Sequence, residues 1–163
     1  MNGYSFFAPT RVLFGAGKLG GLGAQKLPGT KALIVTTGGN SVKRFGYLGC
    51  LEAELDRAGV AHELFDRIEP NPLRETVNKG GWMARTHGCD FVLALGGGSV
   101  MDGSKGICAV AANPHTDAEG NECPGDIWDF VNGGTALGLP IPNDPLPLVC
   151  VTTTAGTGSQ VDG

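Results

Sequence analysis

The sequence predicts an α/β domain in which helices cover both faces of a parallel sheet. Three observations indicate this class. Short apolar runs of strand length alternate with segments of about ten to fifteen residues at helical spacing. The apolar runs are continuous, which is typical of strands buried on both faces. Three of them lead into glycine-rich turns, and ligands of such sheets bind at the turns that follow the strands.

The composition is that of one globular domain. The chain has 163 residues, of which 41% are hydrophobic and 17% are charged, so a sizeable core is expected. Its 28 glycines predict tight turns or places where the backbone approaches a ligand. The net charge of −4 and the lack of any basic run argue against a general nucleic-acid or membrane-surface binder.

The sequence also predicts a cytoplasmic protein. Its first residues lack the basic start and apolar stretch of a signal peptide, and no apolar run is long enough to span a bilayer. The five cysteines are widely spaced and form no CxxC pair, so we expect reduced thiols without a disulfide framework or zinc knuckle.

The first half of the chain contains three expected strands and two expected helices. In chain order these are a strand at 10–14, a short helix up to about Lys26, a strand at 31–36, a helix at 45–58 and a strand at 63–68. The apolar runs predict the strands, and Pro28-Gly29 ends the short helix. Leu48, Leu51 and Leu55 recur at helical spacing, and Gly59 is the expected C-cap of the helix at 45–58.

The second half begins with the turn Glu69-Pro70-Asn71-Pro72. The elements expected after it are a helix at 73–87 that tolerates Gly80 and Gly81, a strand at 91–95, a helix at 100–112, an irregular segment at 114–146 and a strand at 148–151. Residues 91–95 are the clearest apolar run of the chain.

The formal dinucleotide fingerprint, Gly15-x-Gly17-x-x-Gly20, is set aside. The fingerprint requires an acidic residue about twenty positions further on, and residues 34–41 contain none. A strand-to-helix turn is the favoured interpretation.

The turn at 96–102, GGGSVMD, is the better candidate for a phosphate cradle. Its glycines let the backbone approach a phosphate, and Ser99 is placed to cap a helix whose dipole favours an anion. The alternative is a plain glycine-rich connection with Ser99 as N-cap. Asp102 is either a dipole-stabilising carboxylate or a hydrogen-bond acceptor for a cofactor. For the threonine-rich turn at 152–159, polar turn chemistry and ligand binding are equally good interpretations.

These blocks together resemble the iron-containing alcohol dehydrogenases. The resemblance is carried by GGGSVMDGSK at 96–105, TTAGTGS at 153–159, the Glu69–Pro72 turn and FGAG at 14–17. Residues 38–44 and 125–129 are similar to the NADPH-linked butanol dehydrogenase and aldehyde reductase branch. The resemblance covers the whole chain. It implies a Rossmann-like, dehydroquinate synthase-like N-terminal domain, without the all-helical metal-binding domain that follows it in the family.

The resemblance implies cofactor contacts residue by residue. Gly97, Gly98 and Ser99 would hold the pyrophosphate, and Asn71 and Asp102 would contact the sugar and nicotinamide side. The adenine and phosphate edge would be lined by Thr153, Thr154 and Thr157, and the adenosine 2′ position by Gly38, Gly39, Asn40 and Ser41. Asp162 is a further candidate contact, and Gln160 replaces the usual glutamate after GTGS.

NADP is the preferred cofactor and NAD the second choice. Many NAD-specific relatives carry an aspartate where Thr37 stands, so no carboxylate is expected to repel a 2′-phosphate. Lys43 and Arg44 would attract one, unless they are merely a solvated helix start.

The family binds Fe²⁺ or Zn²⁺ through one aspartate and three histidines of its C-terminal half. His62, His87 and His115 do not match that pattern, so we expect no metal site here, and nucleotide binding without catalysis. The full-length parent is expected to be a homodimer acting on a small alcohol or aldehyde. Two alternatives remain: a stand-alone nucleotide-binding module without chemistry, or a relative of glycerol dehydrogenase or of the sugar-phosphate cyclases.

Overall fold

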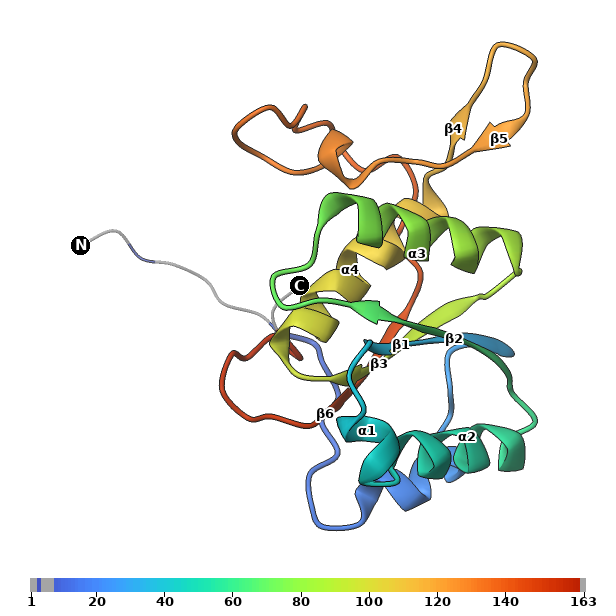
Figure 1. The fold of residues 1–163 in the computed structure, drawn as a ribbon, viewed down its shortest axis with the longest axis vertical. Coiled ribbons are helices and arrows are strands. Elements are labelled where there is room, and N and C mark those ends of the chain that lie inside the picture. Colours follow the sequence, from blue (N-terminus) through green and yellow to red (C-terminus); the bar gives the residue numbers. More distant parts are fainter. Residues whose placement is uncertain (1–2, 4–7, 162–163) are drawn as a thin grey trace.

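The centre of the molecule is a parallel sheet of four strands in the order β2-β1-β3-β6 (Figure 1). The computed structural model describes residues 3 and 8–161. The strands are β1 (Lys31–Thr37), β2 (Ala61–Ile68), β3 (Phe91–Gly96) and β6 (Leu148–Thr152). They confirm the four predicted strands of the sheet. Because β2 and β3 lie on opposite sides of β1, the strand order reverses between β1 and β3, where open α/β sheets bind their ligands.

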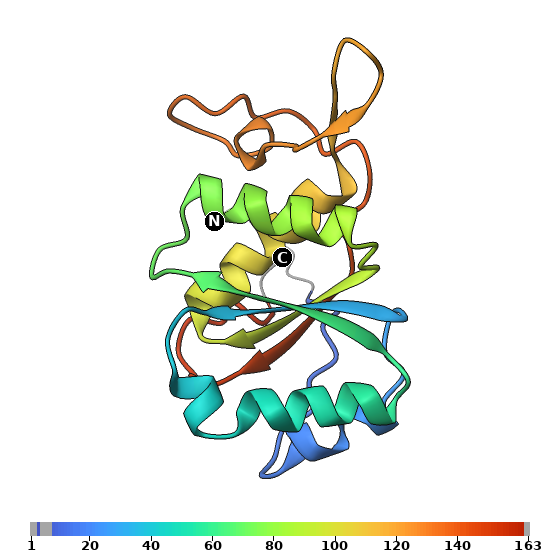
Figure 2. The same ribbon diagram turned by 45° about the vertical axis from the view of Figure 1, so that its right-hand side comes forward.

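Helices cover both faces of the sheet, as predicted (Figure 2). One face carries α3 (Arg74–Thr86) and α4 (Gly98–Ala112), and the other carries α1 (Ser41–Arg44) and α2 (Tyr47–Arg57), with the 3-10 helix η1 (Lys18–Ala24) packed against α2. Successive residues of β1 pack alternately into the apolar clusters on the two faces of the sheet. Leu33 belongs to the apolar cluster under α3 and α4, and Ile34 to the cluster above α2. This two-sided burial explains the continuous apolar runs.

Glycines allow α3 and α4 to pack closely. A Cβ on Gly80 would lie 2.5 Å from Ile107 Cδ1, and one on Gly81 would lie 2.5 Å from Val110 Cγ1. The two glycines lower the helix propensity of α3, but they leave room for the side chains of α4. Tertiary packing therefore accounts for glycines that look unfavourable in the sequence.

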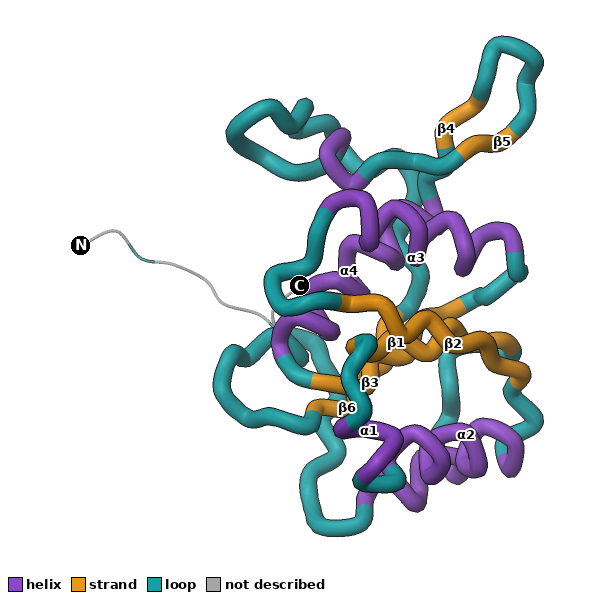
Figure 3. Tube along the Cα trace, viewed as in Figure 1, coloured by secondary structure: helices purple, strands orange, loops and turns teal. Residues whose placement is uncertain are grey.

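Residues 113–147 form an excursion beyond α3, mostly without regular structure, as expected (Figure 3). It does contain a two-stranded antiparallel hairpin, β4 (His115–Thr116) and β5 (Glu122–Cys123), and the 3-10 helix η2 (Ile127–Asp129). The Asp117 carboxylate closes the hairpin by accepting the N–H groups of Glu119 and Asn121 at 3.0 and 2.8 Å.

The predicted strand at 10–14 is wrong. These residues pair with none of the described strands, and Phe14 is 92% exposed. An apolar run becomes a strand only where a neighbouring strand completes its hydrogen bonds. The turn Gly15–Gly20 consequently follows no strand. It opens η1, whose residue Gly23 donates its N–H to Glu54 of α2 at 2.9 Å.

The predicted helix at 45–58 is confirmed as α2, which begins at Tyr47 and ends at Arg57. The short helix α1, which was not predicted, precedes it, and Gly46 with φ 76° separates the two. The short helix expected up to Lys26 is a 3-10 helix that ends at Ala24.

All five cysteines are free thiols, as expected. Burial raises the pKa of Cys108 in α4 to about 12, which keeps this thiol protonated at neutral pH. Among the described helices, none combines the length and apolar character needed to cross a bilayer.

Candidate cofactor site

A cavity of about 240 Å³ lies where the carboxyl ends of β1 and β3 meet. Its lining comes from four segments: Thr37 at the end of β1, Pro70 after β2, residues 97–100 at the start of α4, and Thr154 after β6. Segments far apart in the sequence thus converge at the reversal point of the sheet. The structure brings the predicted pyrophosphate turn and one of the predicted threonines together at this cavity.

Glycines keep the floor of this cavity free of side chains. A Cβ on Gly98 would lie 2.8 Å from Thr157 Cγ2, and one on Gly97 would lie 3.5 Å from Thr154 Oγ1. The first N–H groups of α4 have no acceptor within the helix, and the helix dipole adds partial positive charge at this end. The arrangement suits an anion such as a phosphate group.

Ser99 does not cap α4, so that expectation is wrong. The N-cap is Gly97, which has an extended backbone, and Ser99 is the second residue of the helix. Its Oγ instead accepts the backbone N–H of Asn71 at 3.4 Å. Asn71 is the one non-glycine residue with a positive φ, 55°, in the described chain. The structure therefore joins two predicted cofactor residues through a left-handed turn.

The threonine block after β6 packs on the start of α4. The Thr153 N–H donates to Gly96 O at 2.9 Å, which ties the block to the end of β3. Thr157 shares a 2.8 Å hydrogen bond with the buried Ser159 hydroxyl. Thr153, Thr154 and Thr157 thus lie beside the glycine turn.

The turn after β1 carries a charge pair that the sequence did not reveal. Gly38, Gly39 and Asn40 follow β1, and Lys43 Nζ of α1 lies 2.7 Å from the Asp66 carboxylate of β2. The expectation that no carboxylate is available here is therefore wrong. The acidic residue comes from the neighbouring strand, not from the end of β1.

The basic pair at this turn has two different environments. Lys43 binds Asp66, whereas the Arg44 guanidinium lies over the Phe45 ring, 5.4 Å from its centroid. Ser41 is the first residue of α1. No sequence signal marked Asp66, because its nearness to Lys43 depends on the pairing of β2 with β1.

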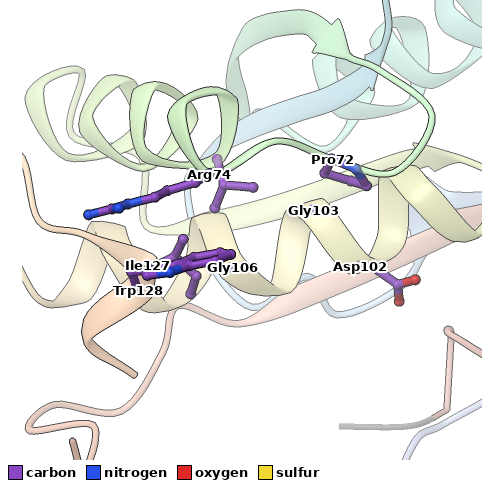
Figure 4. A pocket seen from close by; sticks show the side chains of 8 residues that line it. Pro72, Arg74, Asp102, Gly103, Gly106, Ile127 and Trp128 are labelled. Atoms are coloured by element: carbon purple, nitrogen blue, oxygen red, sulfur yellow. The ribbon is translucent and has the colours of Figure 1, made fainter. Parts of the chain in front are cut away.

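Asp102 lines a second cavity, of about 180 Å³, between α3, α4 and η2. Figure 4 shows the residues that line this cavity, with Asp102 on one side of the group and Trp128 on the other. Asp102 lies 3.7 Å from Lys105 one turn later. It does not line the first cavity.

A cluster around Asp126 holds η2 against α3. Arg74 donates from Nε to both Asp126 oxygens at 2.8 and 3.0 Å, and Asn78 donates to Asp126 at 2.9 Å. The Arg74 guanidinium holds the pKa of Asp126 well below its usual range. Arg74 also lies over the Trp128 ring, 5.5 Å from its centroid. This cluster forms one end of the second cavity.

The described residues do not fit an iron or zinc site. Within residues 3 and 8–161, no three His, Cys, Asp or Glu side chains gather so as to hold a metal ion. The histidines have carboxylate neighbours instead: His115 lies 2.5 Å from Asp129, and His87 lies 3.4 Å from Glu63. The remaining predicted residue, Asp162, lies outside the described residues.

Curated relatives match nearly the whole chain. It is 36% identical over 163 residues to the probable NADH-dependent butanol dehydrogenase 1 of Bacillus subtilis, covering 99% of this chain and 38% of that relative. It is 37% identical over 161 residues to the NADPH-dependent aldehyde reductase YqhD of Escherichia coli, covering 98% and 38%. The chain therefore spans about two-fifths of the length of these relatives.

Solved structures and a family model agree with these relatives. An archaeal alcohol dehydrogenase from a Red Sea brine pool superposes with a TM-score of 0.84 at 37% identity, over 98% of this chain and 38% of that one. The NADH-dependent butanol dehydrogenase A of Thermotoga maritima gives 0.79 at 28% identity, over 97% and 36%. The model of the iron-containing alcohol dehydrogenases matches residues 9–163. The chain thus belongs to the iron-containing alcohol dehydrogenase family.

Proposed function

We propose that this chain is the nicotinamide-nucleotide-binding part of a metal-dependent alcohol dehydrogenase or aldehyde reductase. The observation that carries the proposal is the cavity at the junction of β1 and β3, with the side-chain-free turn Gly97-Gly98 at the start of α4. A glycine turn, a helix N-terminus and a strand-order reversal coincide there, which is how open α/β sheets accommodate dinucleotides.

The cofactor is proposed to extend in both directions from this cavity. Gly97, Gly98 and Ser99 hold the pyrophosphate, with the threonines after β6 along its edge. The turn Gly38–Ser41 surrounds the adenosine 2′ position. Asn71 and Asp102 are assigned to the sugar and nicotinamide side, because the Asn71 turn lies beside Ser99 and Asp102 lies one helical turn further along α4. Asp162 remains a further candidate.

We propose NADPH as the preferred cofactor and NADH as a weaker one. Thr37 leaves the end of β1 without a carboxylate, and Lys43 and Arg44 supply positive charge at the following turn. Asp66 reduces this positive charge, because it pairs with Lys43. The preference is therefore expected to be moderate. Relatives whose names state either cofactor match the chain comparably well.

The complete reaction is proposed for a longer protein, by likeness to relatives of which this chain spans about two-fifths. The nicotinamide supplies hydride transfer between a small alcohol and its aldehyde. This chain's residues bind and orient the cofactor, while Fe²⁺ or Zn²⁺ would be held by residues outside the described chain. A cytoplasmic homodimer is proposed for that protein, and the free thiols support the compartment.

Fluorescence titration of the purified chain with NADPH and NADH tests this function. We expect saturable binding of both, with NADPH bound more tightly. A tenfold preference for NADH would contradict the cofactor assignment, and binding of neither would contradict the proposal as a whole. An assay of butanal reduction with added iron or zinc should give no turnover above background. Turnover would show that this chain contains the catalytic groups itself.

A further inference from the structure

The edge strand β2 carries a bulge where it passes the end of β1. Pairing is regular up to Val35 opposite Phe65 and resumes with Thr37 opposite Ile68, so residues 66–67 of β2 face a single residue of β1. Phe65 and Ile68 both belong to the apolar cluster under α3 and α4. Regular alternation would place residues three apart on opposite faces. The bulge therefore keeps both in the core, and bulges next to binding sites redirect side chains.

The Asp66 side chain leaves this bulge on the opposite face, toward α1. Its carboxylate lies 2.7 Å from Lys43 Nζ, and both side chains are partly exposed, at 37% and 44%. The Lys43 hydrogen bond lowers the pKa of Asp66, so the carboxylate is ionised at neutral pH. The β2 backbone also passes close to the turn after β1, because a Cβ on Gly38 would lie 3.3 Å from Asp66 O.

We propose that Asp66 sets the cofactor preference of this site by competing with the 2′-phosphate of NADPH for Lys43. This inference rests on the proposed function, in which residues 38–41 surround the adenosine 2′ position. Asp66 neutralises Lys43 and would place a second negative charge near the bound 2′-phosphate. A 2′-hydroxyl has no charge, so NADH binding is affected far less. Specificity often depends on such a repulsive element as well as on an attractive one.

The central experiment compares Asp66→Asn with the wild-type chain by titration at low ionic strength. Asparagine preserves the shape of the side chain and removes its charge. We expect the Kd for NADPH to fall about fivefold, the scale of one partly exposed ion pair, while the Kd for NADH stays within about twofold. This gain in NADPH affinity should become smaller in high salt, because salt screens exposed charges. Asp66→Ser gives a second uncharged variant.

Glu63→Gln is the matched control. Glu63 pairs with Lys31 at 3.2 Å, also between β2 and β1, but toward the opposite ends of these strands. Its removal deletes an ion pair and one negative charge far from the 38–41 turn. Both cofactor affinities should therefore stay within about twofold of wild type.

The Lys43→Gln background tests whether Asp66 acts through Lys43. Lys43→Gln alone should weaken NADPH binding and leave NADH binding largely unaffected. Adding Asp66→Asn to Lys43→Gln should give no more than about half of the gain in NADPH affinity that Asp66→Asn gives in the wild-type chain. Three results would overturn the inference: an unchanged NADPH-to-NADH ratio in both Asp66 variants, an equal change for both cofactors, or the full gain in the Lys43→Gln background. Wild-type chain that binds neither cofactor would overturn the proposed function as well.

Discussion

Asn71 shows how one backbone conformation supports the site. It has φ 55°, and its N–H donates to Ser99 Oγ at the start of α4. Asparagine and glycine tolerate this conformation, whereas other residues are strained by about 1–2 kcal/mol. The turn and the start of α4 are therefore coupled through Asn71, a contact that the sequence did not indicate.

Asn71→Ala is expected to lower the free energy of unfolding by about 1 kcal/mol, and Asn71→Gly to leave it nearly unchanged. Both variants lose the side-chain amide assigned to the cofactor, so both should weaken NADPH binding. Thermal unfolding and titration of the two variants separate the backbone role from the side-chain role. Equal stability of the two variants would contradict the conformational explanation.

Gly98 lies in the proposed pyrophosphate turn and leaves no room for a side chain. In Gly98→Ala the new Cβ would lie 2.8 Å from Thr157 Cγ2, so the Thr157 side chain must shift. We expect at least a tenfold loss of NADPH affinity, measured by fluorescence titration. Gly20→Ala is the control, because Gly20 has open space around it and belongs to the fingerprint that was set aside. Normal binding by Gly98→Ala would argue against this turn as the phosphate site.

At the scale of elements, the close packing of α3 against α4 depends on the glycines of α3. Gly81→Ala would bring a Cβ to 2.5 Å from Val110 Cγ1, and valine has little rotamer freedom to move away. We expect a loss of about 1–3 kcal/mol in the free energy of unfolding, measured by chemical denaturation. Gly49→Ala in α2 has open space and is exposed, so the same change there should stabilise by about 0.5–1 kcal/mol. Equal effects of the two substitutions would contradict the packing explanation.

The elements also show where sequence patterns fail. The strands at 31–36 and 91–95 are predicted well because the sheet buries them on both faces, which accounts for their continuous apolar runs. The run at 10–14 has similar side chains, but no described strand lies beside it. Strand formation depends on a neighbour, which a local pattern does not specify.

At the scale of the whole molecule, two carboxylates link stability to pH. Burial raises the pKa of Asp90, but hydrogen bonds from Thr30 and Lys31 outweigh it and the pKa lies below its ordinary value. Arg74 lowers the pKa of Asp126 in the cluster that holds η2. Both carboxylates thus bind protons more weakly in the folded chain than in the unfolded chain.

Stability should therefore be fully present above the unfolded pKa of about 4 and fall as the pH drops below it. We expect the Tm to fall steadily from about pH 5 to about pH 2, as followed by circular dichroism. Asp90→Asn removes one such contribution, so the Tm of this variant should depend less steeply on pH than that of the wild type. A wild-type Tm that is constant over this range would contradict the assignment of these carboxylates.

The sequence by itself determined the fold class, the four strands of the sheet, the helices on both faces and the glycine turn at 96–99, because burial periodicity and glycine chemistry are local properties. Only the tertiary structure decided what surrounds that turn. It placed Thr154 beside Gly97, Asn71 beside Ser99 and Asp66 beside Lys43. These contacts depend on strand order and on one bulge in β2, and neither is encoded in the spacing of residues along the chain.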